Sequence, residues 1–303
     1  TLGGIVATNT FGPRRFGYRT IRDYLIGLRA VDGQGEPFAG GGRVVKNAAG
    51  YDISRLLIGS LGALGVVTQL SLMVRPAAET AAMVVVRLPG LDVAESLLAR
   101  LFQSQVRPVS VDVLNGGWDG ASEEPSNSDD AVRLLVGFEG IRTEVEWMIA
   151  SLRQDCSQQF VQELQVLDRN DTVAMWQWLV ELPAQLQVNL LPSRLPGFFR
   201  AMKQIDPGCA LAAYAGDGIV RIRLSKDAAG RISTLLTNQL RPAVEQMKGS
   251  LVVLSVPPGS ELDAGDVWGT AVCQTPVMHA IKERFDPLGI LNPGRWVFQG
   301  PLP

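Results

Sequence analysis

The stretch from Gly42 to Val67, GRVVKNAAGYDISRLLIGSLGALGVV, constrains this chain more than any other part of it. Its second half carries glycines at positions 59, 62 and 65 and few charged side chains. Glycine lets backbone N–H groups come close to a bound molecule where a side chain would block the approach. A turn that only reverses the chain needs fewer glycines, so the stretch predicts a ligand cradle made of backbone.

The length and the net charge of the chain limit which kinds of ligand it can bind. At 303 residues the chain is long enough for two lobes, because domains commonly hold ~100 to 200 residues. A formal net charge of -2, with 19% charged residues, gives no basic surface for nucleic acid or anionic lipid. The most apolar run, residues 63–74, contains Thr68, Gln69 and Ser71, so no transmembrane segment is expected. We therefore expect a small, near-neutral or acidic ligand in a local pocket.

Cysteine and histidine are too sparse for a metal cluster built by this chain. The three cysteines, Cys156, Cys209 and Cys273, lie far apart in the sequence, and no C-x-x-C pair occurs. This pattern excludes an iron–sulfur or structural zinc site made by the chain alone, and it fits a reducing compartment. The single histidine, His279, excludes sites that need two and is expected to be a partly exposed helix residue. We expect no bound metal.

Two common phosphate-binding motifs are absent. The glycine pairs at 33/35, 40/42 and 216/218 have Phe38, Val45 and Arg221 where G-x-G-x-x-G requires its third glycine. The P-loop pattern G-x-x-x-x-G-K-[ST] does not occur either. The cradle must therefore use a scheme other than a Rossmann site or a P-loop.

The middle of the chain repeats one order of elements. Apolar alternation and helical periodicity predict the order β-α-β-β-α-β twice, which is an α+β domain of two ferredoxin-like units. The first copy has strands at 83–88, 109–114, 132–138 and 160–167, with helices at 92–105 and from 143. The second copy has strands at 188–191, 209–215, 218–224 and 251–256, with helices at 195–205 and 228–247. A helix at 172–182 joins them, and capping boxes are predicted at Asp92 with Glu95 and at Thr143 with Glu146.

The two ends of the chain have a different character. Residues 2–15 predict a Gly-Gly turn, a buried segment and a polar loop, whose Arg14 and Arg15 either reach phosphate oxygens or form a solvated pair. Strands are expected at 20–31, 43–46 and 66–75, a turn at 32–42 and one or two helical turns at 52–58. A helix at 270–285 precedes the turn-rich tail DPLGILNPGRW, which we expect to be docked.

Three segments together carry a family resemblance: LGGIVATNTFGPRR, the Gly42–Val67 stretch and FDPLGILNPGRW, in this order. They resemble the FAD-linked oxidases of the vanillyl-alcohol oxidase (PCMH) type, and among these the FAD-binding subunits of bacterial glycolate oxidases. The resemblance implies a flavin held by two small α+β lobes and covered by a cap domain with an antiparallel sheet. It implies a second FAD-binding lobe at residues 1–80, the cap at 81–258 and a C-terminal segment, 259–303, that returns to the FAD-binding domain.

The family pattern also implies which residues bind FAD. They are Gly3, Gly4, Asn9, Lys46, Asn47, Gly59, Ser60, Gly62, Gly65, the backbone of Val66, Asn292 and Arg295. A fixed cation such as Lys46 or Arg295 beside the ring would stabilise negative charge there. For Lys46 an alternative stays open, which is an ion pair with Asp52 on a surface turn.

Two departures from the family pattern bear on activity. Family members begin with another FAD-binding lobe, which carries a Gly-rich pyrophosphate loop; we expect this lobe to be missing and FAD binding to be weakened. Residues Tyr214–Arg221, YAGDGIVR, align with the family segment H-x-G-D-G-N-x-H and put Tyr214 and Arg221 in place of its histidines. Neither side chain is an ordinary metal ligand or a base near neutral pH. The alternative role of the segment is a plain β-hairpin turn at Gly216–Gly218.

The resemblance implies a FAD-dependent oxidoreductase that acts on 2-hydroxy acids. The leading hypothesis is a FAD-binding subunit of a glycolate oxidase complex that converts glycolate to glyoxylate. Its partners would be a paralogous FAD-linked catalytic subunit and an iron–sulfur subunit, and its location cytoplasmic, with or without attachment to a membrane through those partners. Two alternatives stay open: a self-sufficient 2-hydroxy-acid oxidase in which Tyr214, Arg221 or Lys46 binds the substrate, and a scaffolding subunit without flavin.

Overall fold

The chain divides into two compact units. The computed structural model describes residues 1–42, 51–116, 118, 132–159, 161–257, 262–269 and 275–295. Unit 1 consists of residues 1–11, 19–77 and 270–303, and unit 2 of residues 12–18 and 78–269. The opening segment of the sequence therefore contributes to both units.

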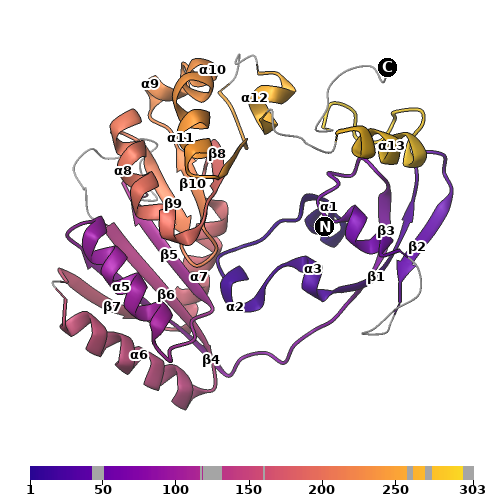
Figure 1. The fold of residues 1–303 in the computed structure, drawn as a ribbon. Coiled ribbons are helices and arrows are strands. Elements are labelled where there is room, and N and C mark those ends of the chain that lie inside the picture. The colour runs from indigo at the N-terminus through magenta and orange to yellow at the C-terminus, as the bar shows by residue number, and fades with distance from the viewer. Residues whose placement is uncertain are drawn as a thin grey trace. The chain divides into compact units, whose positions relative to one another are not determined.

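Unit 2 is built on a sheet that has eight antiparallel strands within the described residues, in the order β11-β8-β10-β9-β5-β6-β4-β7 (Figure 1). The first half comprises β4 (Thr80–Leu88), α5 (Leu91–Gln103), β5 (Ser110–Asn115), β6 (Val132–Gly140), α6 (Arg142–Ser157) and β7 (Glu163–Leu167). The second half comprises β8 (Leu186–Asn189), α8 (Leu195–Ile205), β9 (Ala210–Tyr214), β10 (Ile219–Arg223), α9 (Lys226–Ala229), α10 (Ile232–Leu235), α11 (Arg241–Gln246) and β11 (Ser250–Val253). Each half has the ferredoxin-like strand order, and the halves join where β5 pairs with β9. The predicted duplication is confirmed.

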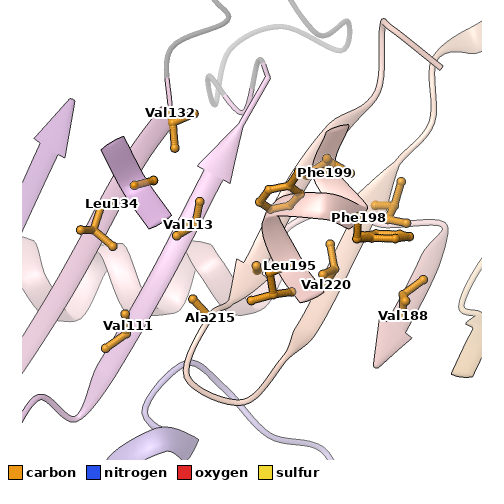
Figure 2. Packing of buried hydrophobic residues seen from close by; sticks show 14 of the residues in the cluster. Val111, Val113, Val132, Leu134, Val188, Leu195, Phe198, Phe199, Ala215 and Val220 are labelled. Atoms are coloured by element: carbon orange, nitrogen blue, oxygen red, sulfur yellow. The ribbon is translucent and has the colours of Figure 1, made fainter. Parts of the chain in front are cut away.

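Helices cover the two faces of this sheet unequally. Helices α5, α6, α8, α10 and α11 pack their apolar residues on one face, which holds the larger core. Figure 2 shows this packing, with Phe198 and Phe199 of α8 beside Val188 and Val220 of the sheet. Helix α7 (Arg169–Glu181) contributes to a smaller core on the opposite face. The strands alternate accordingly, so that one face of β5 presents valines to the larger core and the other presents Ser110, Asp112 and Leu114.

Unit 1 contains a three-stranded sheet within its described residues, in the order β2-β1-β3, formed by β1 (Leu25–Val31), β2 (Pro37–Gly41) and β3 (Val66–Leu72). Four helices belong to its described residues: α1 (Leu2–Thr8), α3 (Ile21–Tyr24), α4 (Ile53–Leu57) and α13 (Thr275–Phe285). Its core consists of Leu28, Ala30, Leu57 and Leu64, with Ile281 and Phe285 of α13 packed against it. The C-terminal helix is thus part of the first unit, and His279 on it is partly exposed, as predicted.

Several local predictions were wrong at the ends of elements. The Gly-Gly pair lies inside helix α1, because the Thr1 side chain caps the N-terminus by accepting from Gly4 N. Residues 37–41 form strand β2 rather than a turn. The glycines there permit close pairing, since a Cβ on Gly41 would lie 2.2 Å from the Ile26 carbonyl oxygen. Strands predicted at 43–46 lie outside the described residues.

The two predicted capping boxes were also wrong. Helix α5 begins after Gly90 and helix α6 after Ile141, and neither start has a side-chain cap. Asp92 and Glu95 instead form ion pairs with Arg200 of α8. The helix expected at 228–247 is divided into α9, α10, five π-helical residues (Leu236–Leu240) and α11. Pro242, in the first turn of α11, cannot donate a backbone hydrogen bond and accompanies this break.

Candidate functional site

The glycine-rich loop that follows helix α4 has an unusual backbone. Gly59, Leu61 and Gly62 all adopt left-handed conformations, with φ of 76°, 55° and 73°. Glycine adopts this region freely, whereas a side chain makes it costly. Backbone N–H groups in such successive turns can form a concave site for an anionic or polar ligand. The loop therefore has the left-handed backbone that such sites use, and its role as a ligand cradle stays a prediction.

Helix α1 holds one side of this loop. Gly59 N donates to Val6 O at 3.0 Å and Leu61 N donates to Ala7 O at 2.8 Å. Asn9 ends the helix in a left-handed conformation, and its Cβ lies 3.6 Å from where a Cβ on Gly59 would stand. The Oδ1 atom of Asn9 is buried and accepts no hydrogen bond within the described part of the chain. An acceptor left in this way costs about 1–3 kcal/mol, so it fits a donor supplied by a ligand.

The C-terminal tail holds the other side of the loop. Asn292, also left-handed with φ of 47°, donates its side-chain amide to the carbonyl oxygen of Leu61. Its Nδ2 atom lies 3.6 Å from where a Cβ on Gly62 would stand. Arg295 N donates to Asn292 O at 3.3 Å, and the Arg295 side chain is exposed. Three stretches that are far apart in the sequence, represented by Asn9, Gly59–Gly62 and Asn292, thus meet at one place in unit 1.

The second candidate site is the β9–β10 hairpin of unit 2, which contains Tyr214 and Arg221. The Arg221 guanidinium lies 5.3 Å from the Tyr214 ring centroid. It donates to Val180 O at 2.8 Å and Leu179 O at 3.4 Å, which are carbonyls at the C-terminus of α7. A cation at this end of a helix is favoured by the helix dipole. Burial raises the pKa of Tyr214 to about 12 against the opposing charge of Arg221, so the phenol stays protonated at neutral pH.

Comparison with known proteins identifies the family. A family model described as FAD linked oxidases, C-terminal domain, matches residues 274–296. The chain is 30% identical to the glycolate oxidase subunit GlcE of Escherichia coli, over 97% of this chain and 71% of that protein. The chain belongs to the FAD-linked oxidases. Both the predicted family and the predicted fold class are confirmed, and FAD, the predicted cofactor, is named in the family's own description.

Other FAD-linked oxidases match over a similar extent. Identity is 26% to the glycolate oxidase subunit GlcD of Bacillus subtilis, over 97% of this chain and 67% of that protein. It is 24% to a D-lactate dehydrogenase of Archaeoglobus fulgidus, over 98% of this chain and 70% of that protein. The solved structure of alkyldihydroxyacetonephosphate synthase superposes with a TM-score of 0.61 at 17% identity, over 97% of this chain and 58% of that chain. This last likeness shows the fold.

The loop residues of this FAD-linked oxidase fit a flavin. Gly59 and Gly62 provide backbone without side chains, and a Cβ on Gly62 would meet no heavy atom nearer than 3.6 Å in the described part. The orphaned Asn9 Oδ1 offers an acceptor, and Arg295 brings a cation on the same tail turn as Asn292. One backbone donor (Gly62 N), one acceptor and one cation are groups that can bind the polar ring edge and the negative charge of such a cofactor.

The other predicted flavin-binding residues differ in their surroundings. Gly3 and Gly4 lie within α1, and a Cβ on Gly3 would stand 3.5 Å from Val67. Gly65 packs under β1, where a Cβ would stand 3.1 Å from the Val31 carbonyl oxygen. Ser60 is buried, and Val66 begins β3 with an exposed side chain. Lys46 and Asn47 lie outside the described residues.

Several side chains have partners that the sequence did not predict. Asp52 caps α4 and pairs with Arg55 at 2.7 Å. Arg14 pairs with Glu139 at 2.9 Å, and Arg15 pairs with Asp217 at 3.4 Å. The two arginines thus pair with carboxylates of unit 2, and the Arg14 side chain also remains about half exposed, at 49%.

The sequence did not point to the buried charges of Asp112, Lys282 and Asp286. Asp112 of β5 lies opposite Tyr214, is 1% exposed, and neither of its carboxylate oxygens meets a donor at hydrogen-bonding geometry in the described part. Its position between valines on an apolar strand was the available signal. Lys282 and Asp286 form a buried ion pair at the end of α13, and their spacing of four residues on a predicted helix was the signal there.

Within the described residues, no three His, Cys, Asp or Glu side chains gather into a group able to hold a metal ion. Every helix in the described ranges is too short or too polar to cross a bilayer.

Proposed function

We propose that this chain is a FAD-binding subunit of a glycolate oxidase complex and supports the oxidation of glycolate to glyoxylate. The observation that carries the proposal is the similarity to GlcE along 97% of the chain, with GlcD next. Both relatives are named as subunits, which supports a multi-subunit assembly. The meeting of Asn9, the glycine-rich loop and Asn292 supports FAD as the bound group.

The chain's own residues would hold the cofactor as follows. The backbone N–H of Gly62 and the Asn9 side-chain oxygen would bind polar atoms of the cofactor, because the N–H groups of Gly59, Ser60 and Leu61 already donate within the protein. Asn292 keeps the loop in place through Leu61 O. Arg295 supplies positive charge, which would stabilise the negative charge of a reduced flavin. When bound, FAD would supply a two-electron acceptor, the chemistry that oxidation of a 2-hydroxy acid requires: one hydride leaves the carbinol carbon with both electrons, and one proton leaves the hydroxyl.

The hairpin of unit 2 supports placing the main substrate chemistry in a partner. Tyr214 is a neutral phenol with its pKa raised to about 12 by burial, so it offers no base near pH 7. Arg221 is occupied by the α7 carbonyls. We propose a paralogous FAD-linked catalytic subunit for glycolate and an iron–sulfur subunit for electron exit. The free cysteines Cys156 and Cys209 are buried and their pKa values are raised by burial to about 11 and 12, which does not suit cluster ligation.

The test is to purify the protein expressed from its full coding sequence, alone and with its proposed partners. We expect a yellow protein that releases FAD on denaturation, and glycolate-dependent dye reduction only when the partners are present. A colourless but folded preparation would contradict the FAD assignment.

A second candidate function is a self-sufficient 2-hydroxy-acid dehydrogenase, which the similarity to a D-lactate dehydrogenase favours. Turnover of glycolate or D-lactate by the chain without partners would select this function. In that case Arg221→Met should raise KM for the acid, because the guanidinium would be a carboxylate ligand.

A further inference from the structure

A buried cation connects the C-terminal helix to the glycine-rich loop. Lys282 of α13 is buried, and its ammonium donates to Ala63 O at 2.8 Å, to Leu291 O at 3.2 Å and to the Asp286 carboxylate. An ammonium group has three hydrogens, so these acceptors use all of them. Ala63 belongs to the loop, and Leu291 belongs to the tail that carries Asn292.

The partner carboxylate is equally well enclosed. Asp286 is fully buried and accepts from Ile290 N at 3.0 Å and Leu291 N at 2.8 Å, in addition to Lys282. Burial acts to raise the pKa of Asp286, but the hydrogen bonds from Lys282, Leu291 and Ile290 outweigh it and lower the pKa. The turn between β1 and β2 closes over this carboxylate, since a Cβ on Gly33 would stand 2.3 Å from Asp286 Oδ1.

The pair and Asn292 hold successive parts of one loop. Lys282 binds the carbonyl of Ala63, and Asn292 binds the carbonyl of Leu61, which is two residues earlier. Gly62, which has a left-handed backbone, lies between these two carbonyls, so a hydrogen bond restrains the chain on each side of it. The tail therefore fixes the direction in which the loop presents its backbone groups.

Stability alone does not account for this pair. Apolar residues of the same volume often replace a buried ion pair without loss of stability, whereas a hydrogen-bonded pair specifies one geometry. The same helix already has apolar anchors in this unit, such as Phe285, whose ring lies 5.2 Å from that of Phe38. We propose that Lys282 and Asp286 are positioning residues, which fix the Gly59–Gly62 loop in the shape that receives the flavin. This inference rests on the proposed function.

Two variants remove the contacts by different means. Lys282→Met deletes the ammonium that binds Ala63 O and Asp286. Asn292→Gly deletes the amide that binds Leu61 O, and glycine tolerates the left-handed backbone at this position, so this variant is expected to fold. Leu25→Ala is the matched control, because it removes core packing from the same unit without touching these hydrogen bonds.

Three quantities are measured in the protein expressed from its full coding sequence. They are the Kd for FAD, the reduction potential of the bound flavin, and amide hydrogen exchange at residues 59–64 in the FAD-free protein. We expect the Kd to rise about 10-fold in Asn292→Gly and about 100-fold or more in Lys282→Met. The potential should shift and exchange at residues 59–64 should accelerate in both variants. Leu25→Ala should lower stability without these local effects.

The outcomes separate this inference from the proposed function. If the wild-type protein binds FAD and both folded variants keep its Kd, its potential and slow exchange at 59–64, the inference is wrong and the proposed function stands. If the wild-type protein binds no FAD, the proposed function is wrong, and the flavin part of the inference with it. Faster amide exchange at residues 59–64 in the variants would then support only the part of the inference that says Lys282 and Asn292 hold the loop in one conformation.

Discussion

Asp286 in unit 1 and Asp112 in unit 2 are both buried carboxyl groups, yet their environments shift the carboxyl pKa in opposite directions. Asp286 accepts hydrogen bonds from an ammonium and two backbone N–H groups, and its pKa is lowered despite burial. Asp112 meets no donor at hydrogen-bonding geometry in the described part of the chain. Burial raises its pKa well above the usual range, the nearby Ser110 hydroxyl offsets this only in part, and Asp217 adds to it.

The difference shows that the partners of a buried charge, and not burial, decide its role. An ionised Asp286 ties α13, the tail and the β1–β2 turn together beside the flavin-binding loop. Asp112 of β5 lies opposite Tyr214, where burial raises the pKa of its carboxyl well above the usual range. The first group contributes to the architecture of the site, and the second is a cost that unit 2 tolerates.

The largest loss of stability should come from removing one partner of the buried Lys282–Asp286 ion pair. Lys282→Met leaves Asp286 buried without its cation and should destabilise unit 1 by about 3–5 kcal/mol, measured by urea denaturation. The double variant Lys282→Met/Asp286→Leu should be less destabilised than the single one, because no uncompensated charge remains. Equal losses in the two proteins would mean that the charges do not interact.

Asp286→Asn should show the pH dependence of the paired carboxyl. A lowered pKa in the folded state adds stability that is fully present above the unfolded pKa of about 3.9 and is lost as pH falls through the folded value. We expect the variant to lose about 2 kcal/mol at pH 7 and less at pH 3. Urea denaturation at both pH values measures this, and a loss that does not change with pH would contradict the lowered pKa.

Asp112→Asn should change stability in the opposite direction from Asp286→Asn: it should stabilise the protein, and more so at high pH. A raised pKa in the folded state means that the wild-type protein is most stable below the unfolded pKa of about 3.9 and loses stability as pH rises towards the folded value. The variant should therefore be more stable than wild type by about 1 kcal/mol or more at pH 8, and by little at pH 3. Glu144→Gln, an exposed carboxyl in the same unit, is the control and should have no such effect.

A smaller loss is expected for the arginine that caps α7. Arg221→Met removes the donors to Leu179 O and Val180 O and should cost about 1 kcal/mol of stability. Under the subunit hypothesis, glycolate oxidation by the assembled complex should keep its KM. A large rise in KM would show that Arg221 binds substrate instead.

The smallest effect is expected at the surface. Arg200→Gln breaks the exposed contacts with Asp92 and Glu95 between α8 and α5, which water and salt already screen. Its urea midpoint should match that of the wild type at physiological salt. A clear loss would mean that exposed pairs matter in this fold as much as the buried one does.

Sequence pattern was sufficient for the parts of the molecule that depend on local periodicity. The two βαββαβ copies follow from alternation such as that of Val111 and Val113, and from the helical spacing of Val145, Met148 and Leu152. Val109, expected on the same side, precedes β5 and packs in the smaller core on the opposite face. Helix α1 was missed because its Gly-Gly pair has low helical propensity, which the Thr1 cap and tertiary packing overcome. Strand β2 was missed because its glycines look like a turn until their partner strand is known.

The candidate site was predicted in part for a similar reason. The family motifs pointed to Asn9, Gly62 and Asn292, which the structure brings together. They did not point to Lys282, because its acceptor Ala63 is 219 residues away and no local pattern reports such a contact. Long-range polar pairing is a property of the folded chain.

The most direct test of the flavin assignment compares two glycines of unit 1 that share a left-handed backbone. Gly62 has φ of 73° and lies in the loop, whereas Gly35 has φ of 83° and lies in the β1–β2 turn, where a Cβ would meet nothing within 4 Å. Alanine at either position has a similar backbone cost, about 1–2 kcal/mol. FAD titration should show a Kd raised at least about 10-fold in Gly62→Ala and unchanged in Gly35→Ala. Equal affinities in both variants would contradict the account.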